Sequence, residues 1–370
     1  MDKITIFGDS DKTTIDKKNT IYIVPVKNLL LTSETNYEIL INGIKFISHK
    51  KLLEDENTKI SVPKKVSEID KKFYKYDTYA VKQYTDYNEE QHDLFREEVN
   101  KALDILSLSQ LIYANREQNA VLSFSNERSI NNISFLVVSN ENYLHENLVL
   151  DSPIPLKIDK NWVIFQSFSF FYDLLKIINN GVKKTLKNKI QKNWREKLLS
   201  AAILAGKSQR SRNLWYSFLL NMIALEIILV ADGEKFTDTL PERVEAFIGW
   251  SNNWKVEDLH LKVSKLYVKR CDIVHRGKLD ITYDDLRLSD YFLFNTLQNI
   301  VKHIDLFPKQ AELVLFSKKV QAEKLLGIES NVRPETLQDI GHNKIIQKKY
   351  VPKHIWDIVD HMIKHGTRQD

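Results

Sequence analysis

The hydrophobic and polar positions follow one pattern in residues 1–152 and another after them. In the first part, short runs rich in Ile, Val and Tyr are bounded by clusters of Asp, Lys and Asn, which predicts strands. The runs cover residues 4–7, 20–26, 37–47, 60–62, 120–124 and 133–138. Asn42-Gly43 favours a two-residue hairpin turn. Residues 89–115 have apolar positions at helical spacing, so this part is expected to be α+β.

The second part is expected to be almost wholly helical. It follows residues 151–155, where two prolines hold the chain extended. Apolar periodicity predicts helices over residues 163–178, 183–205, 210–231, 241–250, 258–275 and 284–307. Gly206-Lys207-Ser208 is expected to break the second helix, and Pro241 to lie in the first turn of the fourth. Loops this short favour antiparallel packing of neighbouring helices.

These patterns divide the chain into a β-rich α+β domain (1–152), an all-α helical bundle (153–307) and a short helical extension (308–370). Gly327, Pro334, Gly341 and Pro352 interrupt the extension. Its last piece has four potential ligands on one helix face, namely His354, Asp357, His361 and His365. These four span about 16 Å, so they cannot all bind one ion. We interpret them as a solvated or partner-facing stripe, and we expect no metal and no cofactor.

The amino-acid composition indicates the cellular compartment in which the protein is expected. Cys271 is the only cysteine, which excludes an intrachain disulfide and a cysteine zinc cage, and a reducing cytoplasm fits best. The N-terminus lacks the pattern of a signal peptide. The apolar run at 213–231 has the length of a membrane span, but Asn221 and Glu226 lie within it. A carboxylate in mid-bilayer is costly, so we expect a buried bundle helix and no membrane.

The net charge of +5 is too small to identify a partner, but residues 183–212 are strongly basic, with Glu196 as the only acid. The cations proposed for RNA binding are Lys183, Lys184, Lys187, Arg210 and Arg212. Such a block could neutralise phosphates. A solvated helix face is the alternative, because no aromatic residue beyond Trp194 interleaves with the cations to stack on bases.

Arg270 and His275 place a cation and an imidazole within an apolar helical frame. RNA carries its own nucleophile, the ribose 2′-hydroxyl. Histidine suits proton transfer near neutral pH, and the guanidinium fork of arginine matches phosphate oxygens. Five residues of an ideal helix turn about 500°, which leaves the two side chains about 140° apart. Either the helix unwinds near Gly277, or two copies pair so that their motifs line one cleft.

Three segments carry a resemblance to a known family. They are Ala224-Leu225-Glu226 in a long apolar helix, Tyr267-x-x-Arg270-x-x-Ile273-Val274-His275-x-Gly277 at a helix end, and the apolar helix 284–307. This ordered set, over about residues 170–307, resembles the HEPN superfamily and, within it, the Apea-like HEPN domains. The resemblance implies a metal-independent endoribonuclease with a composite site at a homodimer axis, where His275 is the general acid or base and Arg270 stabilises phosphate. It also implies abortive infection or another antiviral defence in a prokaryote, where a regulatory partner or phage trigger activates a toxin that cuts RNA.

Further residues are assigned auxiliary roles. Asp272 lies within i+3 reach of His275 and could orient the imidazole, and Arg276 flanks the motif. Tyr267 is expected to pack its helix rather than contact RNA. Glu226 is expected to bond a buried Tyr or Arg; the alternative is a place beside the active cleft.

A non-catalytic reading remains open. Arg270 could form a structural ion pair with Glu257, Asp258 or Asp272, and His275 could cap its helix, where a cation is favoured. Many nucleolytic HEPN proteins have a polar residue where this chain has Cys271. The alternative is therefore a HEPN module that dimerises or binds a partner or nucleic acid. A cysteine nucleophile beside His275 is disfavoured, because no glycine-rich loop accompanies it.

Overall fold

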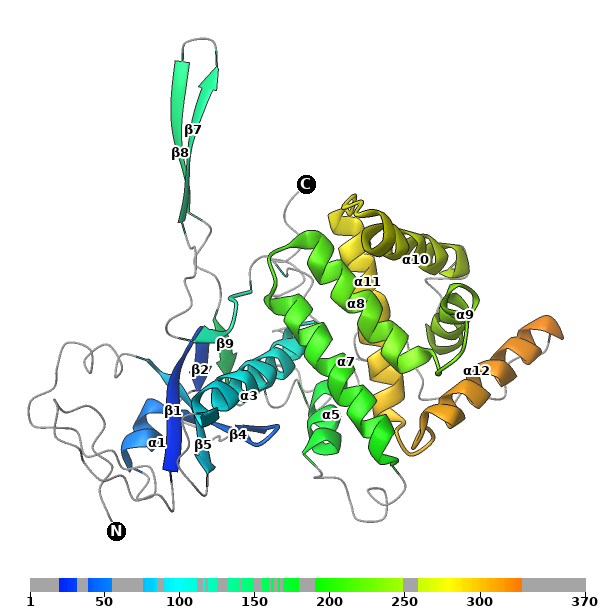
Figure 1. Cartoon of the computed structure of the whole chain (residues 1–370), viewed down its shortest axis with the longest axis horizontal. Helices are drawn as coiled ribbons and strands as arrows, with labels where there is room; N and C mark the ends of the chain where they lie inside the picture. The colour runs from blue at the N-terminus through cyan, green and yellow to red at the C-terminus, as the bar shows by residue number, and fades with distance from the viewer. Residues whose placement is uncertain are drawn as a thin grey trace, which may run out of the picture. The chain divides into compact units, whose positions relative to one another are not determined.

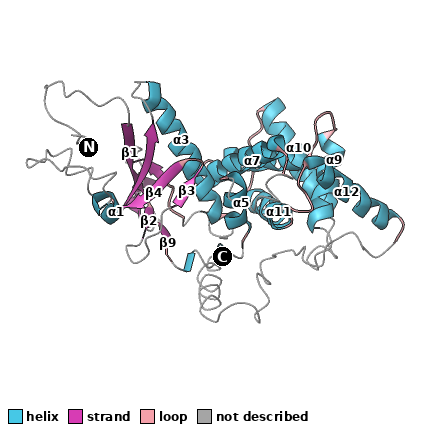
Figure 2. Ribbon diagram, turned by 90° about the horizontal axis from the view of Figure 1, so that it is seen from below, coloured by secondary structure: helices cyan, strands magenta, loops and turns pink. Residues whose placement is uncertain are grey.

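The computed structural model of this chain describes residues 20–31, 39–54, 76–84, 90–111, 116, 119–124, 132–139, 142–149, 155–159, 161–162, 166, 169–179, 190–248 and 259–327. Two compact units are present. The first consists of Met1–Leu103 and Asn115–Trp162, and the second of Asp104–Ala114 and Val163–Asp370. A small antiparallel sheet lies in the first unit and helices dominate the second, so the fold is α+β (Figures 1 and 2).

The sheet has the strand order β3-β4-β5-β1-β6. Its strands are β1 (Thr20–Lys27), β3 (Ile39–Ile41), β4 (Ile44–Ser48), β5 (Thr78–Tyr84) and β6 (Ser123–Phe124). Asn42 and Gly43 both have positive φ, 48° and 82°, and form the tight turn that pairs Ile41 with Ile44. This backbone twist matches that of hairpin strands and confirms the predicted turn. The predicted strands at 4–7 and 60–62 lie outside the described residues.

Two smaller strand pairs complete the first unit. β2 (Leu29–Leu31) pairs in parallel with β9 (Leu156–Ile158), and β7 (Asn132–Ser139) pairs with β8 (Asn142–Val149). Because β9 joins a strand from the start of the chain, the unit boundary falls after Trp162 rather than after residue 152. The unit also contains α1 (His49–Glu54) and most of α3 (Glu90–Ser107), which continues into the short 3-10 helix η1 (Leu108–Gln110).

The second unit is a helical bundle built around α8 (Figure 1). Its helices are α5 (Phe170–Ile178), α7 (Lys192–Arg210), α8 (Leu214–Leu229), α9 (Phe236–Ile248), α10 (Leu259–Arg276), α11 (Tyr283–Lys302) and α12 (Gln310–Leu325). α8 packs against α7, α9, α10 and α11, which explains why it is apolar on nearly every side. Among the described residues, no helix combines the length and the apolar character needed to cross a membrane.

Several helix boundaries differ from the sequence prediction. α7 does not break at Gly206. The glycine lies inside the helix, where the backbone of residue 104 leaves no room for a side chain: a Cβ at Gly206 would lie 1.6 Å from the Asp104 carbonyl oxygen. α9 begins at Phe236, so Pro241 lies inside the helix and not in its first turn. α11 begins near the expected residue, where Thr282 and Asp285 form a capping box, but it ends at Lys302 rather than at residue 307.

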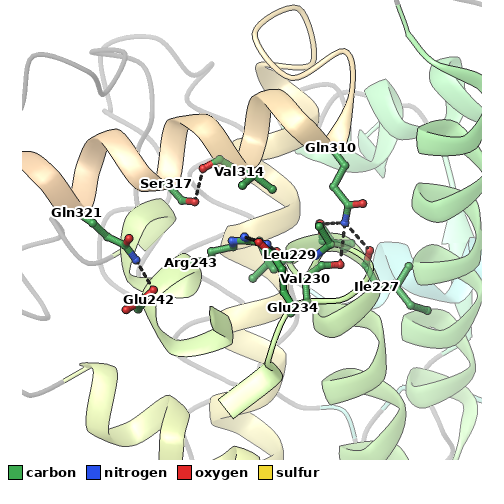
Figure 3. Close-up of polar contacts among 12 residues, drawn as sticks. Ile227, Leu229, Val230, Glu234, Glu242, Arg243, Gln310, Val314, Ser317 and Gln321 are labelled. Atoms are coloured by element: carbon green, nitrogen blue, oxygen red, sulfur yellow. Dashed lines mark hydrogen bonds and ion pairs between the residues drawn. The ribbon is translucent and has the colours of Figure 1, made fainter. Parts of the chain in front are cut away.

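α12 belongs to the bundle rather than to a separate extension. The Gln310 amide at its start donates to the carbonyls of Ile227, Ile228 and Val230 at 3.2, 3.1 and 3.0 Å (Figure 3). Arg243 donates to the carbonyl of Leu229. These donors satisfy carbonyls that lack partners at the end of α8. The histidine stripe expected between residues 354 and 365 lies outside the described residues.

Candidate functional site

The Arg270 to His275 segment is regular α-helix. α10 continues to Arg276, and Gly277 ends it with a positive φ of 64°. The Gly277 amide donates to the carbonyl of Ile273 at 3.1 Å, as an uninterrupted helix requires. The helix therefore does not unwind near Gly277, and the first way of bringing Arg270 and His275 together is excluded within one copy.

Arg270 lies on the side of α10 that packs into the bundle. Its Nε is 2.8 Å from Glu226 Oε1, and its Nη2 donates to Glu226 Oε2 at 2.9 Å. The two side chains are 19% and 7% exposed. Only the second contact has hydrogen-bond geometry, since Nε and Oε1 find no hydrogen-bond partner among the described residues. The ion pair ties α10 to α8, and it gives Glu226 the buried arginine partner that the sequence suggested.

Burial controls the ionisation of this cluster. Removal from water raises the pKa of the Glu226 carboxyl, while the charge and the hydrogen bond of Arg270 oppose that rise. Burial and the neighbouring Cys271 raise the pKa of Tyr267 to about 12. The Tyr267 ring centre lies 5.9 Å from the Arg270 guanidinium carbon. Tyr267 therefore stays neutral near pH 7 and packs the inner side of α10, as expected.

His275 lies on the outer, exposed side of α10. Asp272 does not orient it: the Asp272 carboxylate pairs with Arg276 at 3.1 Å and lies 3.9 Å from Lys278. The expected contact is wrong because cations that follow the motif take the carboxylate. Within one copy, Arg270 and His275 thus lie on different sides of the helix and do not form a joint site.

Among the described residues of the basic segment 183–212, two cations form ion pairs with acids outside the segment. Arg210 Nη1 is 2.7 Å from Asp104 Oδ1, and Lys197 Nζ is 3.2 Å from Asp232 Oδ1. Trp194 is buried and donates its indole N–H to the Phe307 carbonyl at 2.9 Å, so it is not a stacking surface. Arg212 is exposed. The other cations proposed for RNA binding, Lys183, Lys184 and Lys187, lie outside the described residues.

Two features were missed from the sequence. Lys269 Nζ lies 2.6 Å from Asp285 Oδ2, which attaches α10 to the capping box of α11. In addition, Leu261 and Val268 are 47% and 59% exposed, on the same side of α10 as His275. Their spacing of seven residues was the available signal for a shared face, since seven residues return to nearly the same side of a helix.

In the part of the chain that the structure describes, no group of three or more His, Cys, Asp or Glu residues could hold a metal ion. Comparison of the chain with protein-family models, curated proteins and solved structures finds no match.

Proposed function

We propose that this protein is a metal-independent endoribonuclease of the HEPN type, in which His275 transfers protons. One observation carries the proposal: the two helices that bear the family resemblance meet at the motif residues themselves. Glu226 of the Ala224-Leu225-Glu226 segment bonds to Arg270 across 44 positions of sequence. A chance match of two short patterns would not require the two segments to be in contact.

The chemistry needs one proton acceptor, one proton donor and a cation. The 2′-hydroxyl loses its proton to an imidazole, and its oxygen attacks the adjacent phosphorus. The bond to the 5′-oxygen then breaks, and that oxygen takes a proton from an acid. The products are a 2′,3′-cyclic phosphate and a 5′-hydroxyl. Exposed His275 supplies the base or the acid, because an imidazole can both accept and donate a proton.

Two arginines compete for the role of phosphate stabiliser. The motif indicates Arg270, but this side chain has to leave Glu226 before it reaches a phosphate. Arg276 follows His275 directly, and its side chain is 66% exposed in its pair with Asp272. An exposed ion pair exchanges partners at little cost, whereas a buried one does not. The resemblance to Apea-like domains supports a role in prokaryotic defence, in which a homodimer would cleave RNA after a regulatory partner or phage trigger acts.

A second function is favoured by the Arg270–Glu226 pair. If Arg270 serves only to join α10 and α8, the bundle is a HEPN module that dimerises or binds a partner without catalysis. Cys271, in place of a polar neighbour, agrees with this alternative. Such a module would keep its oligomeric state after substitution of His275 by alanine and would cleave no RNA.

The test compares wild type with His275→Ala, Arg270→Ala and Arg276→Ala on a single-stranded RNA in EDTA. Circular dichroism first establishes equal folding. We expect His275→Ala to lose at least about 100-fold in rate, the usual range for a general acid or base. The arginine whose loss lowers the rate without unfolding the protein is the phosphate stabiliser. Equal rates for wild type and His275→Ala would refute the proposal.

A further inference from the structure

The side of α10 that faces away from the bundle combines exposed apolar, charged and imidazole groups. We call it the outer face of α10, and it consists of Leu261, Lys265, Val268, Asp272 and His275. At about 100° per residue, these positions fall within about 40° of one line along the helix. Val268 is the most exposed apolar side chain of α10, at 59%. Such a line is the pattern by which two helices pack along their length.

The outer face complements itself when two copies run antiparallel about a twofold axis at Val268. Lys265 lies three residues before Val268, and Asp272 lies four after it. In this register the heights of Lys265 and the partner's Asp272 along the helix axis differ by only about 1.5 Å. The two also lie on the same side of the helix pair, so opposite charges meet twice. Within one copy Lys265 and Asp272 are about 10 Å apart along the helix and make no such contact.

The same register brings two histidines together. His275 lies seven residues after Val268, and His260 lies eight before it. His275 and the partner's His260 therefore differ by about 1.5 Å in level, on the side of the pair opposite the charged contacts. Both histidines are exposed in the single copy. In this register the partner's Leu261 lies level with His275, and one imidazole pair falls at each end of the contact.

We infer that the outer face of α10 is an antiparallel contact with a second copy of this chain, and that His275 and the partner's His260 form one proton-transfer pair for RNA cleavage. This inference rests on the proposed ribonuclease function. The neutral imidazole takes the 2′-hydroxyl proton, the protonated one gives its proton to the leaving 5′-oxygen, and exchange with water resets both. Arg270 remains in its pair with Glu226 on the other side of α10, so Arg276 stabilises the phosphate.

The register is tested by charge exchange. Lys265→Asp and Asp272→Lys are each expected to weaken the dimer at least about 10-fold in sedimentation velocity, because like charges then meet across the contact. The double variant is expected to restore dimerisation, since the opposite charges meet again with their places exchanged. Lys319→Asp, at an exposed position of α12, is the control and should leave the dimer unchanged. The proposed register would be overturned if the two single variants dimerised as tightly as wild type, or if the double variant dimerised no more tightly than the single variants.

The shared site is tested by mixing two inactive proteins. His260→Ala and His275→Ala are each expected to be inactive as homodimers. After exchange of subunits, about half of the dimers are mixed, and each mixed dimer contains one intact histidine pair of two. We expect about a quarter of the wild-type rate. No recovery, with mixed dimers present by native mass spectrometry, would overturn the pairing. If wild type cleaves no RNA, the proposed ribonuclease function is refuted instead. The charge-exchange experiment would still test the antiparallel register of the dimer.

Discussion

Arg270 and Glu226 form a nearly buried ion pair between α10 and α8, with Nε 2.8 Å from Oε1. The arginine that the motif marks for chemistry therefore also holds two helices of the bundle together. His275, five residues later, lies on the exposed side of the same helix. Because the two positions differ in their surroundings, we expect substitution of Arg270 to lower the stability of the bundle, and substitution of His275 to lower activity at unchanged stability.

Arg270→Ala should lower the free energy of unfolding by about 3–5 kcal/mol, because it leaves the Glu226 carboxylate buried without its partner. Chemical denaturation measures the loss. Arg270→Met combined with Glu226→Met should recover much of it, since an apolar pair of similar volume needs no compensating charge. Arg276→Ala is the matched control on the same helix and should cost at most about 1 kcal/mol, because its pair with Asp272 is exposed.

Gln310→Ala should destabilise the bundle by about 1–3 kcal/mol, because several backbone carbonyls at the end of α8 lose their donor. Gln321→Ala removes the same type of side chain from the same helix, where its amide donates to exposed Glu242 at 2.7 Å. We expect that control to change stability by less than about 0.5 kcal/mol. Equal losses in thermal unfolding for the two variants would show that the capping of α8 contributes nothing specific.

Because of the Lys269–Asp285 contact, we expect the stability of the protein to depend on pH in the acidic range. Burial alone would raise the pKa of Asp285, but the bonds from Lys269 and Thr282 outweigh it and hold that pKa below the ordinary value of 3.8. A carboxyl with a lowered folded-state pKa stabilises the fold above its unfolded-state pKa, and this contribution is lost as the pH falls through the folded-state value.

Asp285→Asn should therefore destabilise the protein near pH 6, and its difference from wild type should shrink as the pH falls below about 4. Urea unfolding at a series of pH values measures this change. Asp284→Asn, an exposed acid in the same helical turn, is the control and is expected to have a much smaller effect at pH 6. If the difference in free energy of unfolding between wild type and Asp285→Asn stays constant down to pH 3, the lowered pKa of Asp285 does not stabilise the fold.

Local rules predicted much of the fold. The turn at Asn42-Gly43 followed from two residues that tolerate positive φ, and the helices followed from apolar periodicity. The failures came from long-range packing. Gly206 is typical of a helix break in sequence, yet it lies inside α7, where the nearby backbone of residue 104 leaves no room for a side chain. Likewise, no local pattern indicates that β9 pairs with β2, since those strands are far apart in the chain.

At the candidate site, spacing predicted that Arg270 and His275 would lie on different sides of the helix, and they do. Sequence also suggested a buried partner for Glu226, but it could not identify Arg270 as that partner. It placed Asp272 beside His275, whereas Arg276 takes that carboxylate. Which of several neighbouring charged side chains form an ion pair depends on their conformations and burial in the folded bundle. Residue spacing alone does not specify these pairs.

The most direct measurement of the central claim is the initial rate at which purified protein cuts one end-labelled RNA in EDTA, together with the identity of the new ends. We expect 2′,3′-cyclic phosphate and 5′-hydroxyl ends from wild type, and loss of nearly all cleavage in His275→Ala at unchanged thermal stability. Cleavage by folded His275→Ala at the wild-type rate, or no cleavage by wild type under any trigger tested, would contradict it.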